Sequence, residues 1–380
     1  MLNLLYVYHK RFLTSFSLVS RKHIEYIRKL SLANVYELDD IVFPNFIPDT
    51  RYKLVLHPWT SLWDDLVEHL RRVAGENLKH RVDQYIEYRK SMYDGLIGFD
   101  VCDSDAISDW AVSLLNHADK VIVPSRFCRD VFERSGVRSR IYVLPHGVDS
   151  EWFSTPNITE TGPREKISLA VALPYMYKVK TGKKMLLFWL LHSGPRKGFE
   201  EVLEVYERIK KERDDVFLVI KTSVKDMPEI KEVEDRIRRL EIIHVFGWAS
   251  DYEKMFLYDS ADITLLFTRA GAFEINCLES LARGTPCIAH DKGSWTDYLP
   301  DFLRVKAGEK IKIFERNIMH TGYGYKIDVE DAVDKIHDIL DNYGDYKART
   351  EEWRQKVLFN EYRWDIIAQK LVNIIKSLGD

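Results

Sequence analysis

The segment Thr268-Arg-Ala-Gly-Ala-Phe-Glu-Ile-Asn-Cys-Leu-Glu-Ser-Leu-Ala-Arg-Gly-Thr-Pro-Cys-Ile-Ala289 carries the clearest structural signal in the chain. A short apolar run, 263–267, precedes it, and a turn of small residues, 270–272, leads into a stretch with the apolar spacing of a helix. Gly284 ends that helix, and Pro286 opens the next β-rich run. Strand, turn, helix and strand in this order are typical of a parallel sheet covered by crossover helices.

The same alternation extends in both directions from this segment. Strands are predicted in the first half at Leu4–Tyr8, Lys53–Leu56, Gly95–Phe99, Lys120–Val123 and Ile141–Leu144, and in the second half at Met185–Leu191, Val216–Lys221, Ile242–Phe246, Ile263–Phe267 and Pro286–Ala289. The stretch Glu151–Lys184 between the halves contains several prolines and weak periodicity, which indicates a linker.

The length and the pattern together predict the fold class. The chain has 380 residues, of which 46% are hydrophobic, enough to bury two cores. We predict an α/β fold of two Rossmann-like, doubly wound domains: residues 1–165, residues 166–360, and a helix over 361–380 that is free to pack back on the first domain. Open α/β sheets bind ligands at the carboxyl ends of their strands, so we expect the chemistry in an interdomain cleft.

Composition excludes several classes of protein. The formal net charge of −3 gives no basic field for nucleic acid as the main partner. Four cysteines stand far apart with no Cys-x-x-Cys pair, which favours reduced thiols over a disulfide framework or a zinc site. The run Met185–Leu191 is far shorter than the roughly 20 residues that span a bilayer. We expect a cytoplasmic protein, and peripheral contact with a membrane surface and the oligomeric state stay open.

Two loops of the second half have the composition of an anion-binding site. N–H groups at the start of a helix near Phe273, with the helix dipole, favour a negative group. The sequence His192-Ser-Gly-Pro-Arg-Lys-Gly198 puts Gly194, Arg196 and Lys197 after a predicted strand, and these two cations suit a diphosphate leaving group. A solvated basic turn is the alternative. Glu279 lies inside the helix near its inward face and needs hydrogen-bond donors there.

These motifs resemble the signature of family 4 retaining glycosyltransferases, which have the GT-B fold and belong to glycosyl transferases group 1. In that family Glu-Gly-Phe-Gly is followed by Leu-Glu-Ala and Gly-x-Pro. Glu279, Gly284 and Pro286 match the second Glu and the closing residues. The first Glu of the family falls on Gly271, and Glu274 stands three residues later, where the family has Gly.

The resemblance implies a role for each matched residue. Arg196 and Lys197 would hold the diphosphate of a nucleotide sugar, and Glu279 would bind its ribose. Glu274 either contacts the sugar in place of the missing Glu or only stabilises the helix start. The resemblance implies that the donor-binding residues are Gly194, Gly271, Ala272, Phe273, Ile275, Glu279, Trp248 and Ser125.

Further candidates stand at other predicted strand ends. Trp248 either stacks on the nucleotide base or plugs the domain core. In the first half, Pro124-Ser125 and Pro145-His146-Gly147 resemble the end of the family's first domain, and Ser125 and His146 either touch ligand or serve as hinge and turn. His57 is the candidate for contact with the acceptor, with Asp103 as the alternative.

The loop after the first strand departs from the family because it has no glycine. Contacts from it would come from the side chains of His9, Lys10, Thr14 and Ser15.

The implied reaction is transfer of a sugar from a nucleotide-diphosphate sugar, of UDP or GDP type, to a glycan, lipid or protein-linked acceptor, with retention of anomeric configuration. It needs no metal and no cofactor besides the donor substrate. Asp103-Ser-Asp105 has the letters of an Asp-x-Asp metal motif, but its place in the first domain argues against that role. Two other classes stay open: a non-catalytic protein that binds sugar nucleotides or glycans, which Gly271 favours, and a sugar-nucleotide epimerase.

Overall fold

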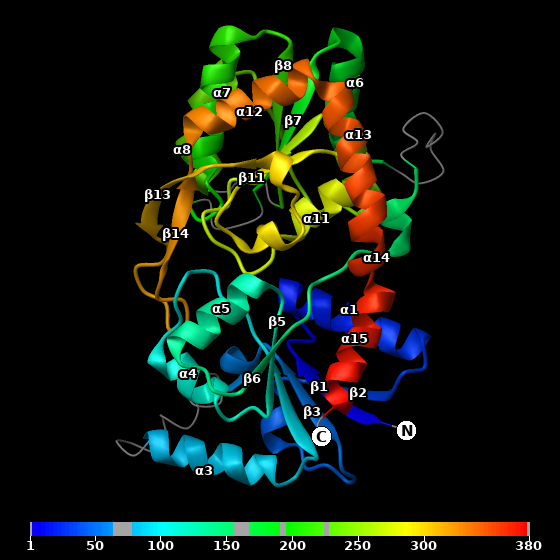
Figure 1. Ribbon diagram of the computed structural model, residues 1–380, viewed down its shortest axis with the longest axis vertical. Helices are drawn as coiled ribbons and strands as arrows, with labels where there is room; N and C mark the ends of the chain where they lie inside the picture. The colour runs from blue at the N-terminus through cyan, green and yellow to red at the C-terminus, as the bar shows by residue number, and fades with distance from the viewer. Residues whose placement is uncertain (1, 64–77, 156–166, 191–194, 224–227, 378–380) are drawn as a thin grey trace. The chain divides into compact units, whose positions relative to one another are not determined.

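The chain forms two α/β units in a computed structural model that describes residues 2–63, 78–155, 167–190, 195–223 and 228–377 (Figure 1). The first unit collects three stretches of sequence, Met1–Gly147, Phe314–Gly322 and Tyr362–Asp380. The second unit comprises Val148–Ile313 and Tyr323–Glu361. The predicted boundary between residues 165 and 166 lies outside the described residues.

A six-stranded parallel sheet in the order β2-β1-β3-β4-β5-β6 forms the first unit. Its strands are β1 (Asn3–Tyr8), β2 (Asn34–Asp39), β3 (Lys53–His57), β4 (Gly95–Phe99), β5 (Lys120–Val123) and β6 (Arg140–Val143). Its helices are α1 (Ser15–Lys29), α3 (Leu78–Lys90), α4 (Asp109–Leu115), α5 (Arg126–Ser135) and α15 (Trp364–Lys376), with a 3-10 turn at Phe43–Asn45. All residues of β4 are buried, as expected for a parallel strand covered on both faces.

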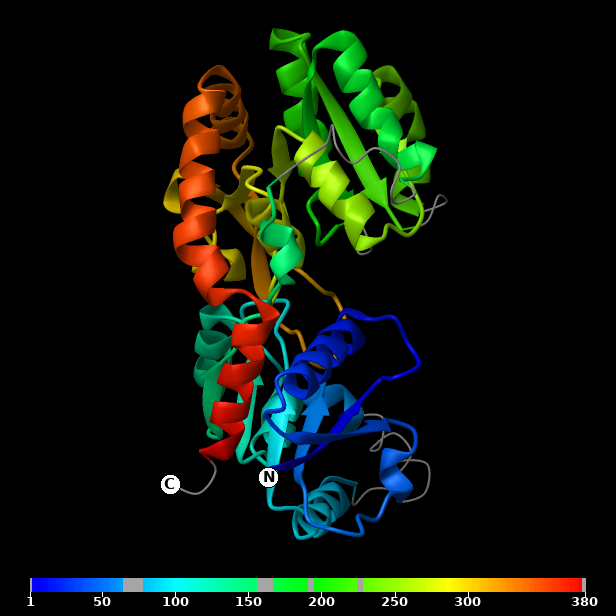
Figure 2. The same cartoon turned by 90° about the vertical axis from the view of Figure 1, so that its right-hand side faces the viewer.

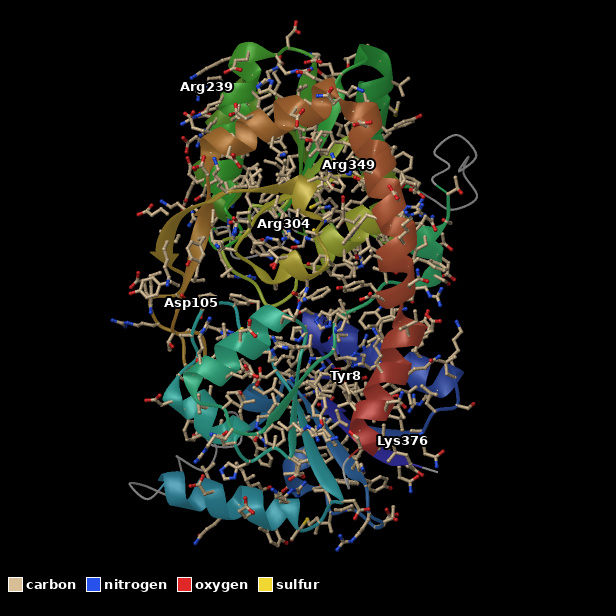
Figure 3. All side chains as sticks on the ribbon, in the orientation of Figure 1. Tyr8, Asp105, Arg239, Arg304, Arg349 and Lys376 are labelled. Carbon is tan, nitrogen blue, oxygen red and sulfur yellow. The ribbon has the colours of Figure 1, made fainter. Side chains whose placement is uncertain are left out.

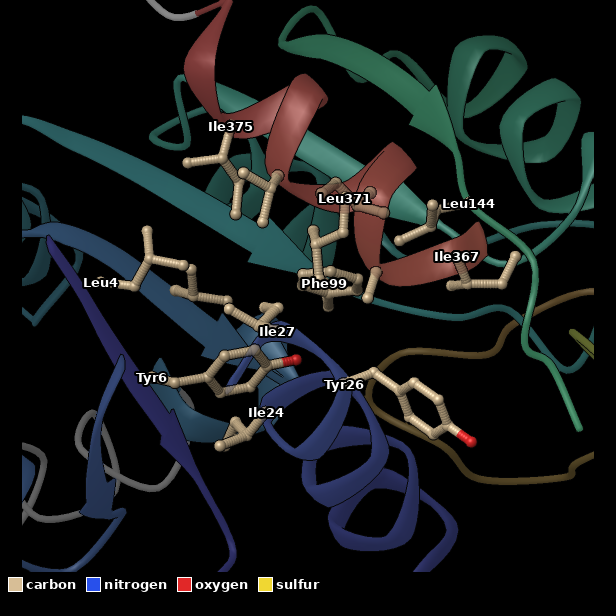
Figure 4. Packing of buried hydrophobic residues seen from close by; sticks show 14 of the residues in the cluster. Leu4, Tyr6, Ile24, Tyr26, Ile27, Phe99, Leu144, Ile367, Leu371 and Ile375 are labelled. Atoms are coloured by element: carbon tan, nitrogen blue, oxygen red, sulfur yellow. The ribbon is translucent and has the colours of Figure 1, made fainter. Parts of the chain in front are cut away.

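The last helix of the chain completes the core of this unit. Trp364, Ile367, Leu371 and Ile375 repeat at helical spacing, and they pack with β1 and α1 in one buried cluster (Figure 4). Burying a side chain of this size contributes roughly 1.5–3 kcal/mol. Tyr8, at the end of β1, is also buried and donates a hydrogen bond of 2.9 Å to Glu37 (Figure 3).

Two strand lysines fix the carboxyl end of α15. Lys53 donates to the carbonyl of Ile375 at 2.9 Å, and Lys120 donates to the carbonyl of Ile374 at 2.6 Å. The last carbonyls of a helix lack intrahelical partners and carry partial negative charge, so both ammonium groups are well placed there.

A second six-stranded parallel sheet, in the order β12-β11-β10-β7-β8-β9, forms the other unit. Its strands are β7 (Lys184–Leu190), β8 (Val216–Thr222), β9 (Ile243–Val245), β10 (Ile263–Leu265), β11 (Cys287–His290) and β12 (Arg304–Val305). Its helices are α6 (Leu169–Thr181), α7 (Phe199–Glu212), α8 (Pro228–Glu232), α9 (Glu234–Arg239), α10 (Asp251–Ser260), α11 (Ile275–Ala282), α12 (Val329–Asp341), α13 (Tyr343–Trp353) and α14 (Phe359–Glu361), with short 3-10 turns at Ser150–Phe153, Ser294–Asp297 and Asp301–Leu303 and a π-helical turn at Arg354–Leu358. Figure 2 shows α13, in orange, lying along this unit.

An antiparallel hairpin, β13 (Ala307–Lys312) with β14 (Tyr323–Ile327), is added to the second unit. Residues Phe314–Gly322, between its strands, belong to the first unit. Ser108 N–H donates to the carbonyl of Met319 at 2.9 Å, and Thr321 N–H donates to that of Ala106 at 3.1 Å.

The structure contains elements that the sequence did not predict: the strands β2, β12, β13 and β14, and the helix α6. β2 was not predicted, because Asn34-Val-Tyr-Glu-Leu-Asp39 alternates polar and apolar residues at a partly exposed sheet edge. The predicted linker contains the helix α6, with Pro174 inside it. A proline removes one hydrogen bond of a helix but does not exclude the helix, so Pro174 does not mark a helix end here.

In the described part of the chain, no helix has the length and apolar character needed to cross a bilayer.

Candidate functional site

The loop before α7 carries two cations and is held against the end of β10. Gly198 has a φ of +69°, and a side chain there would overlap the carbonyl of Phe267, so only glycine allows this close approach. Arg269 N–H donates to the carbonyl of Arg196 at 2.8 Å and ties the two loops together. β7 and β10 are neighbours in the sheet, which brings the loops that follow them to the same edge.

Arg196, Lys197 and Glu274 form a buried ion cluster. Lys197 Nζ lies 2.7 Å from each carboxylate oxygen of Glu274. Arg196 Nη1 donates to the carbonyl of Ala270 at 2.8 Å and lies 3.6 Å from Glu274 Oε1. All three charged side chains are buried, and buried charges need partners. The cluster holds one more positive than negative charge, which favours an added anion.

Gly271 faces the carboxylate of this cluster. A Cβ at position 271 would overlap Glu274 Oε1 and would come within 3.5 Å of Arg196 Nη1. The carboxylate of Glu274 therefore occupies the space into which a side chain at 271 would begin to extend. Gly271, at the position of the first Glu in the resembled family, therefore leaves room for the carboxylate of Glu274, three residues later.

The helix after this turn begins later than predicted. α11 starts at Ile275, with Glu274 as its N-terminal cap residue, and not near Phe273. Tyr298 explains the difference, because its hydroxyl donates to the carbonyl of Glu274 at 2.8 Å and accepts from the Glu274 N–H at 3.2 Å. The ring centroids of Phe273 and Tyr298 lie 4.8 Å apart, and this contact holds the turn in a non-helical conformation. Ala272, also predicted to bind the donor, is buried in this turn.

Glu279 lies on the buried face of α11 and already has two donors. Lys254 Nζ lies 2.6 Å from Oε1, and the Tyr258 hydroxyl donates to Oε2 at 2.9 Å. Lys254 and Tyr258 are one turn apart on α10, so they present to α11 together. Burial lowers the pKa of Lys254, but the carboxylates of Glu279 and Asp251 together outweigh burial and hold that pKa above its usual value. Burial, followed by Glu279, raises the pKa of Tyr258 well above its usual value.

Trp248 is 68% exposed on the loop between β9 and α10. It therefore does not plug the domain core, which removes one of its two predicted roles. The carbonyl of the preceding Gly247 accepts a hydrogen bond from Lys221, which also donates to the Thr222 carbonyl at 2.8 Å. Burial lowers the pKa of Lys221 to about 8. The buried lysine fixes the loop from which Trp248 projects.

Ser125 and His57 lie inside the first unit. Ser125 is fully buried and caps α5, accepting from the Cys128 N–H at 3.2 Å. His57, at the end of β3, is 2% exposed, and its Nδ1 lies 2.9 Å from the Ser20 hydroxyl. Burial, followed by the nearby His23, lowers the pKa of His57 well below its usual value and favours the neutral ring. Both side chains are thus engaged in capping and packing within the first unit.

Gly194 lies outside the described residues. Within the described ranges, no group of three His, Cys, Asp or Glu side chains could hold a metal ion. All four cysteines are buried and none of them forms a disulfide bond, and the sulfurs of Cys102 and Cys128 lie 3.1 Å apart.

Sequence reasoning missed the partners of both carboxylates. Lys254 and Tyr258 have the spacing of one helix face, and this was the available signal. Tyr298 gave no such signal, since only the tertiary fold brings it to Glu274.

Family comparisons match both units. Residues 178–356 match the model of glycosyl transferases group 1, and residues 103–152 match that of glycosyltransferase family 4. The chain is 26% identical over 384 residues to uncharacterized protein 356 of Sulfolobus islandicus rod-shaped virus 1, covering 99% of this chain and 98% of that protein. It is 28% identical over 321 residues to putative glycosyltransferase 45 of Sulfolobus islandicus filamentous virus, covering 80% of this chain and 83% of the relative.

Solved structures share the fold. The Anabaena protein HepE in complex with UDP superimposes with a TM-score of 0.63 at 14% identity, covering 99% of this chain and 100% of HepE. At this identity the likeness shows the architecture alone, which is the two-domain GT-B arrangement.

Proposed function

Since two family models and the fold support an assignment to the group 1 glycosyltransferases of GT-B fold, we propose that this chain transfers a sugar from a UDP-type nucleotide sugar to an acceptor hydroxyl with retention of configuration. The observation that carries the proposal is the buried cation pair Arg196 and Lys197 beside the start of α11. UDP is proposed because HepE was solved with it and shares the fold.

Arg196 and Lys197 take the role of stabilising the leaving diphosphate. Negative charge grows on the β-phosphate as the glycosidic bond breaks, and preorganised cations in a site with little water stabilise it strongly. The first helical turn of α11 leaves backbone N–H groups without intrahelical partners, which adds donors on the same side. These groups suffice for the proposed charge stabilisation, so the proposal includes no metal.

In this proposal Glu274 binds the hydroxyl groups of the donor sugar. Its carboxylate lies beside the cations and beside Gly271, where the family has its sugar-contacting Glu. When a diphosphate neutralises Lys197, Glu274 is released to accept hydrogen bonds from sugar hydroxyls. Its carboxylate also keeps the cation pair in place while no donor is bound.

Glu279 and Trp248 bind the nucleoside. Glu279 offers its carboxylate to the two ribose hydroxyls, with Lys254 and Tyr258 orienting it from the other side. Trp248 supplies an exposed aromatic face for the base. The second unit is thus the donor-binding unit, and the first unit binds the acceptor, which is a glycan, a lipid or a protein-linked group.

Retention follows from front-face substitution. The departing phosphate oxygen accepts the proton of the acceptor hydroxyl while that hydroxyl attacks the anomeric carbon from the same face. The chain's own contribution is positioning and charge stabilisation by Arg196 and Lys197.

A donor and acceptor screen tests the function. The protein is incubated with UDP-, GDP- and ADP-sugars in the presence and absence of glycan and lipid acceptors, and released nucleotide and glycosylated product are measured. We expect UDP-sugar turnover that depends on the acceptor, with a product whose anomeric configuration, read by NMR, equals that of the donor. Nucleotide binding without turnover would favour a non-catalytic binder, and isomerised donor without acceptor would favour an epimerase.

An exchange of two residues tests whether Glu274 replaces the family's first Glu. Gly271→Glu alone is expected to lower transfer about 100-fold, because its Cβ displaces the Glu274 carboxylate from Lys197 and a small misplacement has effects of this size. The double variant Gly271→Glu/Glu274→Gly restores the family arrangement and is expected to recover most of the activity. Transfer kinetics at saturating donor provide the measurement.

Gly271→Ala adds only the Cβ and is therefore expected to lower transfer about as far as Gly271→Glu, which isolates displacement of the Glu274 carboxylate as the cause. A double variant as inactive as Gly271→Glu alone would contradict the replacement and would assign Glu274 a structural role.

A further inference from the structure

Helix α6 presents apolar side chains to solvent. Leu169 and Val179 are 70% and 66% exposed, and Leu173 and Met176 are about half exposed. Leu169, Leu173 and Met176 follow one another at intervals of four and three residues, so they form one row along the helix. The helix lies on the outside of the second unit (Figure 1).

The inner face of α6 already secures the helix to its unit. Val171 and Pro174 are buried there. The rings of Tyr175 and Tyr177 pack against Phe256, 5.6 Å away, and Phe217, 4.9 Å away. The exposed row is therefore not required for attachment of the helix. A helix that is apolar on its outer face as well needs a second apolar neighbour.

The charges of this segment are all positive. Residues 167–184 contain four lysines and no acidic residue. Lys178 and Lys184 face Asp262, at 2.6 and 3.7 Å. Lys180 continues the exposed row four residues after Met176, and Lys183 follows just past the helix end. Among the described residues, neither of these two forms an ion pair.

We propose that the exposed row of α6, defined by Leu169, Leu173 and Met176, seats on an anionic lipid bilayer, with Lys180 and Lys183 at the lipid headgroups. A helix with apolar residues on its outer face and lysines at one end is suited to lie in the plane of a bilayer interface. The aliphatic stems of lysine extend along the apolar layer while the ammonium groups reach the phosphates.

A second copy of the chain is the less favoured occupant. A symmetric dimer formed through this row would place Lys180 and Lys183 of each copy at the contact, where the facing segment has no acidic residue to neutralise them. The lipid proposal does not depend on the proposed glycosyl transfer, because binding is measured without donor or acceptor.

Sedimentation with vesicles tests the proposal. The whole protein is mixed with vesicles of phosphatidylcholine alone or of phosphatidylcholine with phosphatidylglycerol, at low and at high salt. We expect binding to the anionic vesicles only, weakened by salt. The variants Leu169→Gln/Met176→Gln and Lys180→Glu/Lys183→Glu are each expected to lower the bound fraction about tenfold.

Ile47→Gln is the matched control, since Ile47 is an exposed apolar residue of the first unit and its replacement should leave binding unchanged. Thermal melts check that every variant folds. Equal binding of all variants, equal binding to uncharged vesicles, or loss of binding in Ile47→Gln would overturn the proposal. A concentration-dependent dimer that the Leu169→Gln/Met176→Gln variant abolishes, without vesicle binding, would replace it with self-association.

Discussion

Lys197→Ala is expected to lower the rate of sugar transfer by about 10²–10³-fold at saturating donor, the usual effect of removing one preorganised donor from a developing charge. Lys197 is buried at the end of the loop before α7, and its ammonium group bonds both oxygens of Glu274. In the proposed reaction it faces the leaving diphosphate. The measurement is product formation under conditions where donor binding is saturated, so that the change reports on the chemical step.

The control separates catalysis from folding. Among the described residues, Lys197→Ala leaves Glu274 with the more distant Arg196 as its cation, and breaking a buried ion pair costs about 3–5 kcal/mol when the remaining charge has no other partner. Lys197→Met/Glu274→Gln removes both charges at similar volume and is expected to regain much of the stability but none of the activity. Lys211→Ala, at an exposed lysine in the last turn of α7, should change neither. Wild-type turnover in Lys197→Ala would disprove the assignment.

Glu279→Ala is expected to weaken the binding of UDP itself by about 10- to 100-fold, because hydrogen bonds to a charged group contribute about 1.5–3 kcal/mol. The proposed contact is with the ribose, which UDP and the UDP-sugar share. Calorimetric titration with UDP measures this loss directly. Glu274→Ala should leave UDP affinity nearly unchanged and lower only the added affinity or turnover that the sugar provides.

Stability must be followed in the same experiment. Without Glu279, Lys254 keeps Asp251, 3.4 Å away, as its acidic neighbour, and part of any loss will be structural. Tyr258→Phe removes one donor to the far side of Glu279 and is expected to reduce UDP affinity much less than Glu279→Ala. An unchanged UDP affinity in a folded Glu279→Ala protein would exclude the ribose contact.

Much of the fold could be predicted because strand signals in parallel sheets are strong. Apolar runs such as 95–99 and 216–221 lie at or within one residue of β4 and β8, where both faces are covered. The sequence does not predict β2, because an edge strand carries polar residues, or α6, because Pro174 is a stop signal for a helix. Residues 314–322 belong to the first unit because they contact residues more than 200 positions earlier in the sequence. No local sequence pattern predicts such contacts.

The candidate site could be predicted in part for a related reason. The positions of Arg196, Lys197 and Glu279 follow from motifs at strand ends. The contact between the Glu274 carboxylate and Lys197 does not follow from these motifs. It depends on how Gly198 and Arg269 hold the two loops together. The exposure of Trp248 likewise depends on packing around its loop and not on its neighbours in sequence.

The three-part composition of the first unit affects the order in which the chain can fold during synthesis. Its sheet leaves the ribosome first, but the cluster around Leu4 and Ile27 stays uncovered until α15 emerges, more than 300 residues later. The residues of the second unit are all synthesised before α15, so the nascent second unit can close first. A chain interrupted before Trp364 is expected to expose the apolar surface that α15 covers in the first unit, and exposed surfaces of this kind favour aggregation.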